Sequence, residues 1–331
     1  MVRTLWLLVL GGLMMNFNVL SSSASEVKRV ESKTFKMTPG GHIAVEGEEG
    51  FIKVNSWDKP EVNLVMTKRA WGRSEKDAEN LLERIEVRIS ESENHLDIKL
   101  VKPRETQTVS FWDLFDPDTW GKYRHGISVD FEITVPKQIN VNLINDEGDV
   151  TIQSIQGDVE IRVDEGDIEL NDIDFEVMNL YANEGDIDGA RLNNPRGRIV
   201  VKLDEGDVTF EEIESQRLSI QCDEGDVTIK KLTCLSCDIS ADEGDVVLAI
   251  SPQEADRYRI SADEGNIVFY LPQSPDVDLD LETRDGDIRS EFDVRILRRD
   301  DRQRCQDKIG EGKSYLEASA DEGTIFLRKD Q

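Results

Sequence analysis

The feature of this sequence that most limits its fold is a short acidic motif around a glycine, which recurs along the second half of the chain. Residues 221–228 read QCDEGDVT, and the glycines of the copies are Gly148, Gly166, Gly185, Gly206, Gly225, Gly244, Gly265, Gly286 and Gly323. Successive glycines are 18, 19, 21, 19, 19, 21, 21 and 37 residues apart, and the last interval is close to two single periods. Spacing of this kind indicates a repeat architecture, in which each unit packs on its neighbours.

Within a copy, apolar residues alternate with polar residues on both sides of the glycine. Leu218, Ile220 and Cys222 share one face of the strand before Gly225, and Val227 continues that face after it. The glycine is expected at the tip of a tight turn, where φ is positive, and the flanking aspartates can accept hydrogen bonds from backbone N–H groups. Each copy therefore predicts two short strands joined by a turn.

Stacking solves a problem that a single copy cannot. A unit of 18 to 21 residues is too small to bury two apolar strand faces by itself. Copies stacked in register bury them, because each strand pairs with its equivalent above and below. The sequence therefore predicts an all-β fold, a parallel β-helix or β-solenoid of about eight or nine turns and roughly 40 Å in length at about 4.8 Å per turn. One turn of this solenoid is called a coil below.

The charge of the chain is concentrated in these copies. The formal net charge is -29, and residues 141–290 hold 38 acidic against 12 basic residues, an excess of 26 (38 − 12). Such a surface repels nucleic acid and anionic lipid headgroups and favours cations and basic partners. Nucleic-acid binding is therefore disfavoured.

The aspartates of the motif allow two interpretations. In register they form rows in which neighbours about 5 Å apart repel by roughly 0.8 kcal/mol even in water. They either extend into solvent as turn caps, which is the favoured interpretation and needs no cofactor, or hold Ca²⁺, which prefers six to eight oxygen ligands. The calcium interpretation names as candidate ligands Asp146, Asp149, Asp164, Asp167, Asp204, Asp207, Asp223, Asp226, Asp242 and Asp245.

Residues 1–24 predict a secretory signal peptide. Arg3 precedes an apolar run from Leu5 to about Met15, and small residues lead to a cleavage position after Ala24. An uncleaved membrane anchor fits less well, because the run is short for a membrane span. We expect an exported protein of the periplasm or cell surface, without stable membrane insertion after cleavage.

The four cysteines, Cys222, Cys234, Cys237 and Cys305, are expected to be structural. An even number in an exported protein favours disulfides, with three possible connectivities, and free thiols are the alternative. A redox or zinc role for Cys234 and Cys237 has little support, because the chain has no second pair with this spacing.

The rest of the chain predicts a division into regions. Residues 25–125 read as a β-rich N-terminal region with one helix at 74–86, for which Ser74 is the expected N-cap. Aromatic residues crowd into 103–126, which we interpret as a plug for the open end of the stack, with an exposed contact loop as the alternative. Residues 126–331 are assigned to the solenoid, with an insertion at 291–314 before the last copy.

The order of these segments resembles the DUF4097 family of β-strand-repeat proteins, related to adhesin-head domains of exported bacterial proteins. The resemblance is carried by GGHIAVEGEEGFIKVNSWDKPEVNLVMTKRA, SEKDAENLLERIEVRI, VDFEITVPKQINVNL, the Gly-Asp-Ile/Val repeats and the closing ASADEGTIFLRK. It covers essentially the mature chain and implies a right-handed β-helix and a cell-envelope setting, with no catalytic residues. The repeated glutamate before the glycine departs from the family, which more often has Asn, Ser or Thr there.

Three functions follow from these patterns. We favour a non-enzymatic cell-envelope protein whose acidic solenoid is a scaffold, adhesion or interaction surface for a protein or envelope-surface partner, in particular a cationic one. A calcium-binding solenoid is the first alternative. A polysaccharide-active enzyme is the second, because parallel β-helices host enzymes that use clustered carboxylates. It has less support because the acidic residues are spread evenly, and no catalytic or cofactor-binding residue is predicted.

Overall fold

The computed structural model describes residues 25–101 and 126–330. The predicted signal peptide and almost all of the aromatic segment 103–126 lie outside the described residues. The described chain forms 25 strands in one continuous hydrogen-bonded sheet and one helix, so the predicted all-β fold is confirmed. No helix in these two ranges has the length and apolar character that a membrane span needs.

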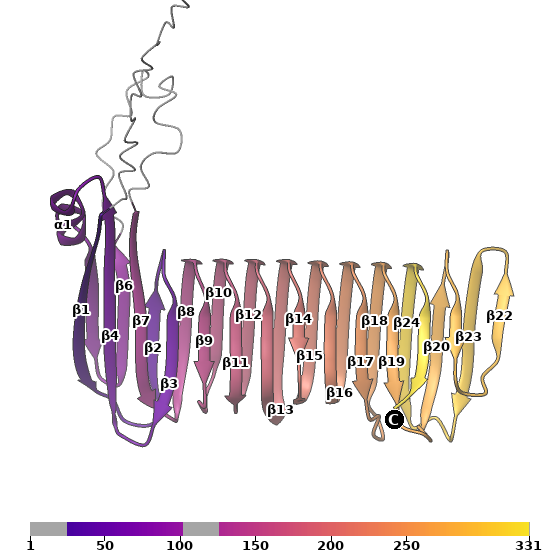
Figure 1. Ribbon diagram of the computed structural model, residues 1–331. Coiled ribbons are helices and arrows are strands. Elements are labelled where there is room, and N and C mark those ends of the chain that lie inside the picture. Colours follow the sequence, from indigo (N-terminus) through magenta and orange to yellow (C-terminus); the bar gives the residue numbers. More distant parts are fainter. Residues whose placement is uncertain (1–24, 102–125, 331) are drawn as a thin grey trace, which may run out of the picture.

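The middle of the chain forms a long stack of coils, which lie side by side in Figure 1. In this part the strands are β8 (Ile139–Glu147), β9 (Val150–Gln153), β10 (Val159–Glu165), β11 (Ile168–Ile173), β12 (Val177–Glu184), β13 (Ile187–Glu205), β14 (Val208–Phe210), β15 (Ile213–Glu224), β16 (Val227–Glu243), β17 (Val246–Ile250), β18 (Arg257–Glu264) and β19 (Ile267–Leu271). Neighbouring coils pair in parallel. Ile161 of β10, for example, pairs with Leu143 of β8 and with Leu180 of β12.

The interior of the stack is built from the alternating apolar residues. Val201, Ile220 and Ile239 occupy one register position on three successive coils, and all three are buried. The side chains between them point outward, so each strand has one apolar and one polar face. The handedness of the coil stays a prediction.

The glycine corner, the turn between the two strands of a copy, needs glycine for two reasons. Gly225 has φ of +137°, a conformation that other residues adopt only with strain. A Cβ atom added to Gly225 would also lie 1.9 Å from the carbonyl oxygen of Gly206 in the preceding coil. The N–H of Gly225 donates to the carbonyl oxygen of Glu243 in the following coil at 2.8 Å. The glycines therefore allow the backbones of successive coils to approach each other.

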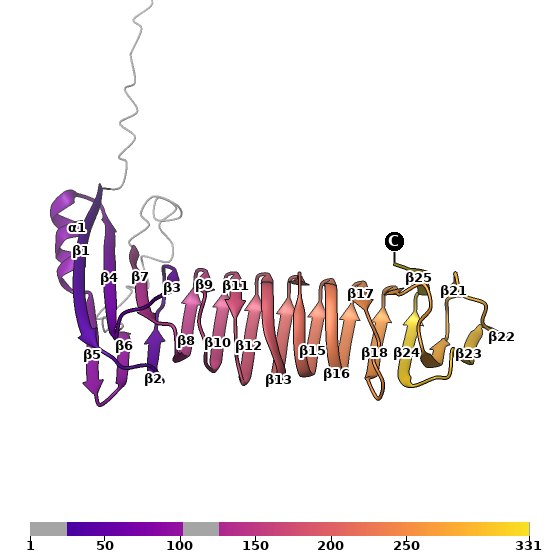
Figure 2. The same ribbon diagram turned by 90° about the horizontal axis from the view of Figure 1, so that it is seen from below.

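The N-terminal region covers one end of the stack, as Figure 2 shows. Its elements are β1 (Ser25–Lys36), β2 (Gly41–Glu46), β3 (Ile52–Trp57), β4 (Glu61–Gly72), α1 (Glu75–Glu83), β5 (Glu86–Ser92), β6 (His95–Val101) and β7 (Gly126–Pro136). The side chain of Ser74 caps α1 by accepting a hydrogen bond from the N–H of Asp77. Strand β4 pairs antiparallel with β7 on one side and with β1 on the other, so the sheet continues past the first coil and β1 is an edge strand.

The stack begins before residue 126, which is the start that we predicted from the sequence. Strands β2 and β3 pair in parallel with β8 and β9, and they flank a corner at Gly50. This corner reads GEEGF, without the aspartates of the later copies, which is why the repeat did not reveal it. Strands β6 and β7 then add a further coil on the outer side of β2 and β3.

The C-terminal coils are not stacked in chain order. The strands here are β20 (Val277–Thr283), β21 (Ile288–Ser290), β22 (Ile296–Arg299), β23 (Arg302–Ile309), β24 (Ser314–Glu322) and β25 (Ile325–Lys329). Strands β24 and β25 pair with β18 and β19 on one side and with β20 and β21 on the other. The last copy of the motif thus lies between the two copies that precede it, which corrects the expectation that consecutive copies stack on each other.

The segment between the copies of Gly286 and Gly323 was predicted as an insertion at 291–314. It forms the antiparallel strands β22 and β23. Strand β23 also pairs antiparallel with β20 and so covers the far end of the stack. A repeat protein needs such a cap, because an open last coil would expose both its apolar interior and its unpaired backbone groups.

Candidate functional site

The aspartates that follow the corner glycines form a continuous ladder along one edge of the stack. The N–H of Asp167 donates to the Asp149 carboxylate at 3.1 Å, and the N–H of Asp226 donates to the Asp207 carboxylate at 2.9 Å. The same contact joins Asp226 to Asp245, and Asp245 to Asn266. We call this row the aspartate ladder: Asp149, Asp167, Asp186, Asp207, Asp226, Asp245 and Asn266. Each of its carboxylates accepts a backbone hydrogen bond from the next coil. A turn-capping aspartate bonds the backbone of its own turn, so the ladder joins neighbouring coils instead of capping single turns.

The aspartates that precede the corner glutamates make a second row, of Asp146, Asp164, Asp204, Asp223 and Asp242. Asp164, Asp204 and Asp242 are exposed, and Asp164 accepts a hydrogen bond from Asn183 on the next coil. Among the residues that the structure describes, no three His, Cys, Asp or Glu side chains gather in a way that could hold a metal ion. The ten predicted calcium ligands are thus placed on one edge in two rows, and calcium binding stays a prediction.

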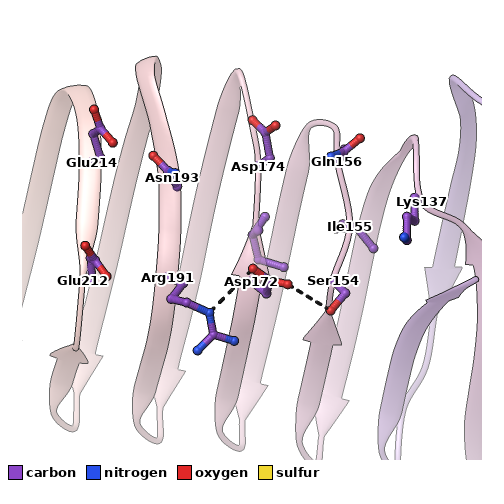
Figure 3. Close-up of a pocket in the computed structure, with 11 residues that line it drawn as sticks. Lys137, Ser154, Ile155, Gln156, Asp172, Asp174, Arg191, Asn193, Glu212 and Glu214 are labelled. Atoms are coloured by element: carbon purple, nitrogen blue, oxygen red, sulfur yellow. Dashed lines mark hydrogen bonds and ion pairs between the residues drawn. The ribbon is translucent and has the colours of Figure 1, made fainter.

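A groove runs along the stack at the turns opposite the glycine corners, as Figure 3 shows. It has a volume of about 350 Å³ and crosses successive coils between β7 and β15. We call it the lateral groove. It is lined by Lys137, Ser154, Ile155, Gln156, Asp172, Ile173, Asp174, Arg191, Asn193, Glu212 and Glu214.

Two rows of polar side chains border the lateral groove. The first row is Ser154, Asp172, Arg191 and Glu212, and the second row is Gln156, Asp174, Asn193 and Glu214, with one member of each row on each coil. The residue between the two rows is apolar and points into the core, so that Ile155 and Ile173 are each only 1% exposed. Every coil therefore presents one polar group on each side of the groove.

Three residues of the first row have an unusual backbone conformation. Ser154, Asp172 and Arg191 have φ of 59°, 62° and 54°, although none of them is glycine. The left-handed region costs a residue with a side chain about 1–2 kcal/mol. Strained positions of this kind gather at functional sites more often than elsewhere. Here they occur at the same turn of three consecutive coils.

The side chains of the first row hold each other in place. The Ser154 hydroxyl donates to the Asp172 carboxylate at 3.4 Å. Arg191 lies 3.6 Å from the same carboxylate and donates to the Asn171 side-chain oxygen at 2.7 Å. On the next coil Glu212 is paired with Lys231. The arrangement supplies fixed donors and acceptors, but the lining residues include no imidazole that could act as a base toward Ser154.

The lateral groove could not be predicted from the repeated motif. Residues at equivalent positions of the groove differ in type from coil to coil. They therefore do not form a repeated motif that can be recognised in the sequence. Their position in the repeat is the signal that could have revealed them. They lie in the segment between successive Asp-Glu-Gly-Asp motifs.

The sequence also gave no indication of a cluster of aromatic and basic residues near the C-terminus. The Arg328 guanidinium lies 4.9 Å from the ring centre of Phe326 and 5.9 Å from that of Tyr270. Phe326 and Arg328 belong to β25 and Tyr270 belongs to β19, so the out-of-order last coil brings them together. Such contacts between cations and aromatic rings contribute about 0.5–1 kcal/mol each at exposed sites.

The cysteines belong neither to the aspartate ladder nor to the lateral groove nor to the cluster of aromatic and basic residues. All four are buried and free, so the structure contains none of the disulfides that the even count favours. Burial raises the pKa of the Cys222 thiol to about 11, with a further contribution from nearby aspartates. Neutral, buried thiols are poor nucleophiles, which fits a packing role for these side chains.

Comparisons with known proteins give one family and several distant structural likenesses. The family model described as Toastrack DUF4097 matches residues 61–328. No curated protein shows a significant match to the chain.

Among solved structures, one described as a putative adhesin from Bacteroides fragilis is 12% identical, with 90% of this chain and 97% of that chain covered and a TM-score of 0.41. One described as a putative lipid binding protein from Parabacteroides distasonis is also 12% identical, covers 90% and 97%, and has a TM-score of 0.39. A putative cell adhesion protein from Clostridium sporogenes is 11% identical, covers 91% and 100%, and has a TM-score of 0.22. These likenesses are too distant to carry a conclusion about function.

Proposed function

This chain belongs to the Toastrack DUF4097 family, and we propose that it is a non-enzymatic exported protein of the cell envelope that uses its solenoid as an interaction surface in adhesion or scaffolding. The export follows from the predicted signal peptide. The partner is a protein or another component of the envelope surface.

The observation that carries this proposal is the lateral groove. It offers hydroxyl, amide, carboxylate and guanidinium groups across four successive coils, on a surface that the stacked backbone keeps rigid. Binding sites gain affinity when their groups are already fixed before the partner arrives. Asp172 already pairs with Arg191, so it is poorly suited to take a proton from Ser154. These properties favour binding over catalysis.

The acidic edge of the stack contributes to the choice of partner. The corner carboxylates lie in two rows along one edge, away from the lateral groove, and the chain carries a net charge of -29. A field of this sign attracts basic surfaces and repels anionic ones, within about 8 Å at physiological ionic strength. We therefore expect partners that are neutral or basic where they face this edge.

The test is co-sedimentation of the purified exported chain with cell envelopes from the organism that makes it. We expect the wild-type chain to sediment with the envelopes and the double variant Arg191→Ala/Asn193→Ala to bind at least about fivefold more weakly, since two hydrogen-bonding groups are removed. The matched control is Arg217→Ala, because Arg217 is exposed on β15 and does not line the groove.

Two results would contradict the proposal. The first is no sedimentation of the wild-type chain above a soluble control protein. The second is release of reducing ends from envelope polysaccharide by the wild-type chain, which would show an enzyme.

A further inference from the structure

We infer that the lateral groove binds a neutral, hydroxyl-rich polysaccharide, which lies along the axis of the stack with about one sugar unit per coil. This inference rests on the proposed function and names the ligand class of that same site. Three properties of the groove support it: its charge sequence, its hydrogen-bonding groups and its repeat distance.

The charge sequence of the first row disfavours ligands of uniform charge. Along the stack the side chains are neutral, negative, positive and negative, at Ser154, Asp172, Arg191 and Glu212. A polyanion would meet Asp172 and Glu212, and a polycation would meet Arg191 in the middle of the groove. Like charges at contact are unfavourable in both cases. A neutral polar chain meets no such repulsion.

The ion pairs around the groove support the same conclusion. Four of the six charged lining residues already have partners, since Asp172 faces Arg191, Glu212 faces Lys231 and Lys137 faces Asp58. A neutral ligand leaves these pairs intact. A polyanion would have to displace a carboxylate from Arg191 or Lys137.

The hydrogen-bonding groups of the groove suit hydroxyls. Each hydroxyl of a sugar both donates and accepts one or more hydrogen bonds, so it needs acceptors and donors nearby. Asp174 and Glu214 provide acceptors, and within the described ranges neither carboxylate has an ion-pair partner. Gln156 and Asn193 provide amides, which donate and accept, and they alternate with these carboxylates along the second row.

The repeat distance of the groove suits a polymer. Equivalent side chains on neighbouring coils are about 4.8 Å apart, because that is the spacing of paired strands. Four coils therefore present a polar group at regular intervals over roughly 14 Å, counted as three spacings. The sugar units of an extended polysaccharide repeat at a similar distance, so successive units meet equivalent positions of the groove.

A peptide is the less suitable polymer. Peptides that bind to sheets usually add a strand at an open edge and use its free backbone groups. The strands beside the lateral groove are paired on both sides, as β11 is with β9 and β13. Recognition here must therefore come from the polar side chains of the two rows.

The experiment is isothermal titration calorimetry of the full exported chain with five sets of probes. Neutral probes are β-1,4-linked glucose, mannose and N-acetylglucosamine oligomers of two to six units. Charged probes are oligogalacturonate and oligolysine of the same lengths. We expect one neutral series to bind, with affinity rising up to about four units and then levelling off. Oligogalacturonate and oligolysine should bind at least tenfold more weakly.

Variants test whether the groove is the site. Arg191→Ala and, separately, Asn193→Ala should weaken neutral oligomer binding about tenfold and about fivefold, respectively. The control Arg217→Ala should bind like the wild type. Thermal melting of each variant checks the fold, and because Asn193 is exposed and does not have positive φ, its variant tests the site even if the Arg191 variant unfolds.

Three outcomes would overturn the inference: no binding of any neutral oligomer, preferred binding of oligolysine or oligogalacturonate, or neutral binding that neither groove variant weakens. These outcomes are separate from the fate of the proposed function. If the chain sediments with envelopes through the groove but binds no neutral oligomer, the ligand class is wrong and the adhesive function stands. If it does not sediment with envelopes at all, the proposed function fails.

Discussion

A substitution at one corner glycine tests the physical basis of the stack. We choose Gly225→Ala, because an added Cβ would lie 1.9 Å from the carbonyl oxygen of Gly206 in the preceding coil. A contact this short cannot be relieved by a side-chain movement, since the neighbouring atom belongs to the backbone. The two coils must therefore move apart at this corner.

The magnitude follows from two contributions. The positive φ of Gly225 costs alanine about 1–2 kcal/mol. Separation of these two coils also weakens the hydrogen bonds between them, from the Gly206 N–H to Glu224 and from the Val208 N–H to Asp226, both at 2.9 Å. Each of these contributes about 0.5–1.5 kcal/mol. We expect a loss of about 2–5 kcal/mol in the free energy of unfolding, obtained as the sum of these ranges.

The chain offers a matched control. Gly40 also has a positive φ, of +82°, but a Cβ added there would meet no atom within 4 Å. Gly40→Ala should therefore cost only the conformational term, about 1–2 kcal/mol.

The assay is urea unfolding followed by circular dichroism, with hydrogen exchange at the strands next to Gly225, because coils of a repeat protein can open locally. If Gly225→Ala is no more destabilising than Gly40→Ala, close contact between successive corners is not what requires glycine.

Four further predictions follow from the structure. Asp226→Asn should leave stability within about 0.5 kcal/mol, because Asn266 already fills the same position of the aspartate ladder, whereas Asp226→Ala should lose about 1 kcal/mol in urea unfolding; equal effects would contradict the role of the ladder. The thiol of Cys222 has a pKa of 9.0 when unperturbed and about 11 in the fold. The unfolded chain therefore ionises first, and the free energy of unfolding should fall as the pH rises from 9 to 11. Cys222→Ala should reduce this loss, and an unchanged pH profile in the variant would refute the role of Cys222. Deletion of residues 314–331 removes the coil between β18 and β20 and should increase hydrogen exchange in both; unaltered protection would contradict the pairing. Calcium or EDTA should leave the melting midpoint unchanged, because the aspartate ladder already uses its carboxylates in backbone contacts; a calcium-dependent rise would instead support the predicted sites.

The repeat was enough to predict the stack but not the order of its coils. The copies have nearly the same sequence around the glycine, so the sequence makes any copy a suitable neighbour for any other. The period alone therefore cannot decide whether the copy of Gly286 or the copy of Gly323 lies next to the copy of Gly265. The 37-residue interval was the one available signal, because it leaves enough chain to make a hairpin and return.

The candidate site was less predictable for a different reason. The turns opposite the glycine corners vary in length and residue type, and Ser154, Asp172 and Arg191 share a position only once the strands are placed in register. Their left-handed conformation is also invisible in the sequence, because none is a glycine. The aspartates, in contrast, were easy to find, but general turn chemistry predicts bonds within one turn and did not predict that they join neighbouring coils.

The central claim is that glycine-cornered coils stack directly on one another, with the last copy inserted between two earlier ones. Oxidative cross-linking tests it directly. Ser261 pairs with Ser319 across β18 and β24, whereas Glu282 of β20 lies one coil further away. The double variant Ser261→Cys/Ser319→Cys should form a disulfide readily, and Ser261→Cys/Glu282→Cys should not, because two coil spacings, about 9.6 Å, exceed the reach of a disulfide. Cross-linking of the second pair and not the first would contradict the claim.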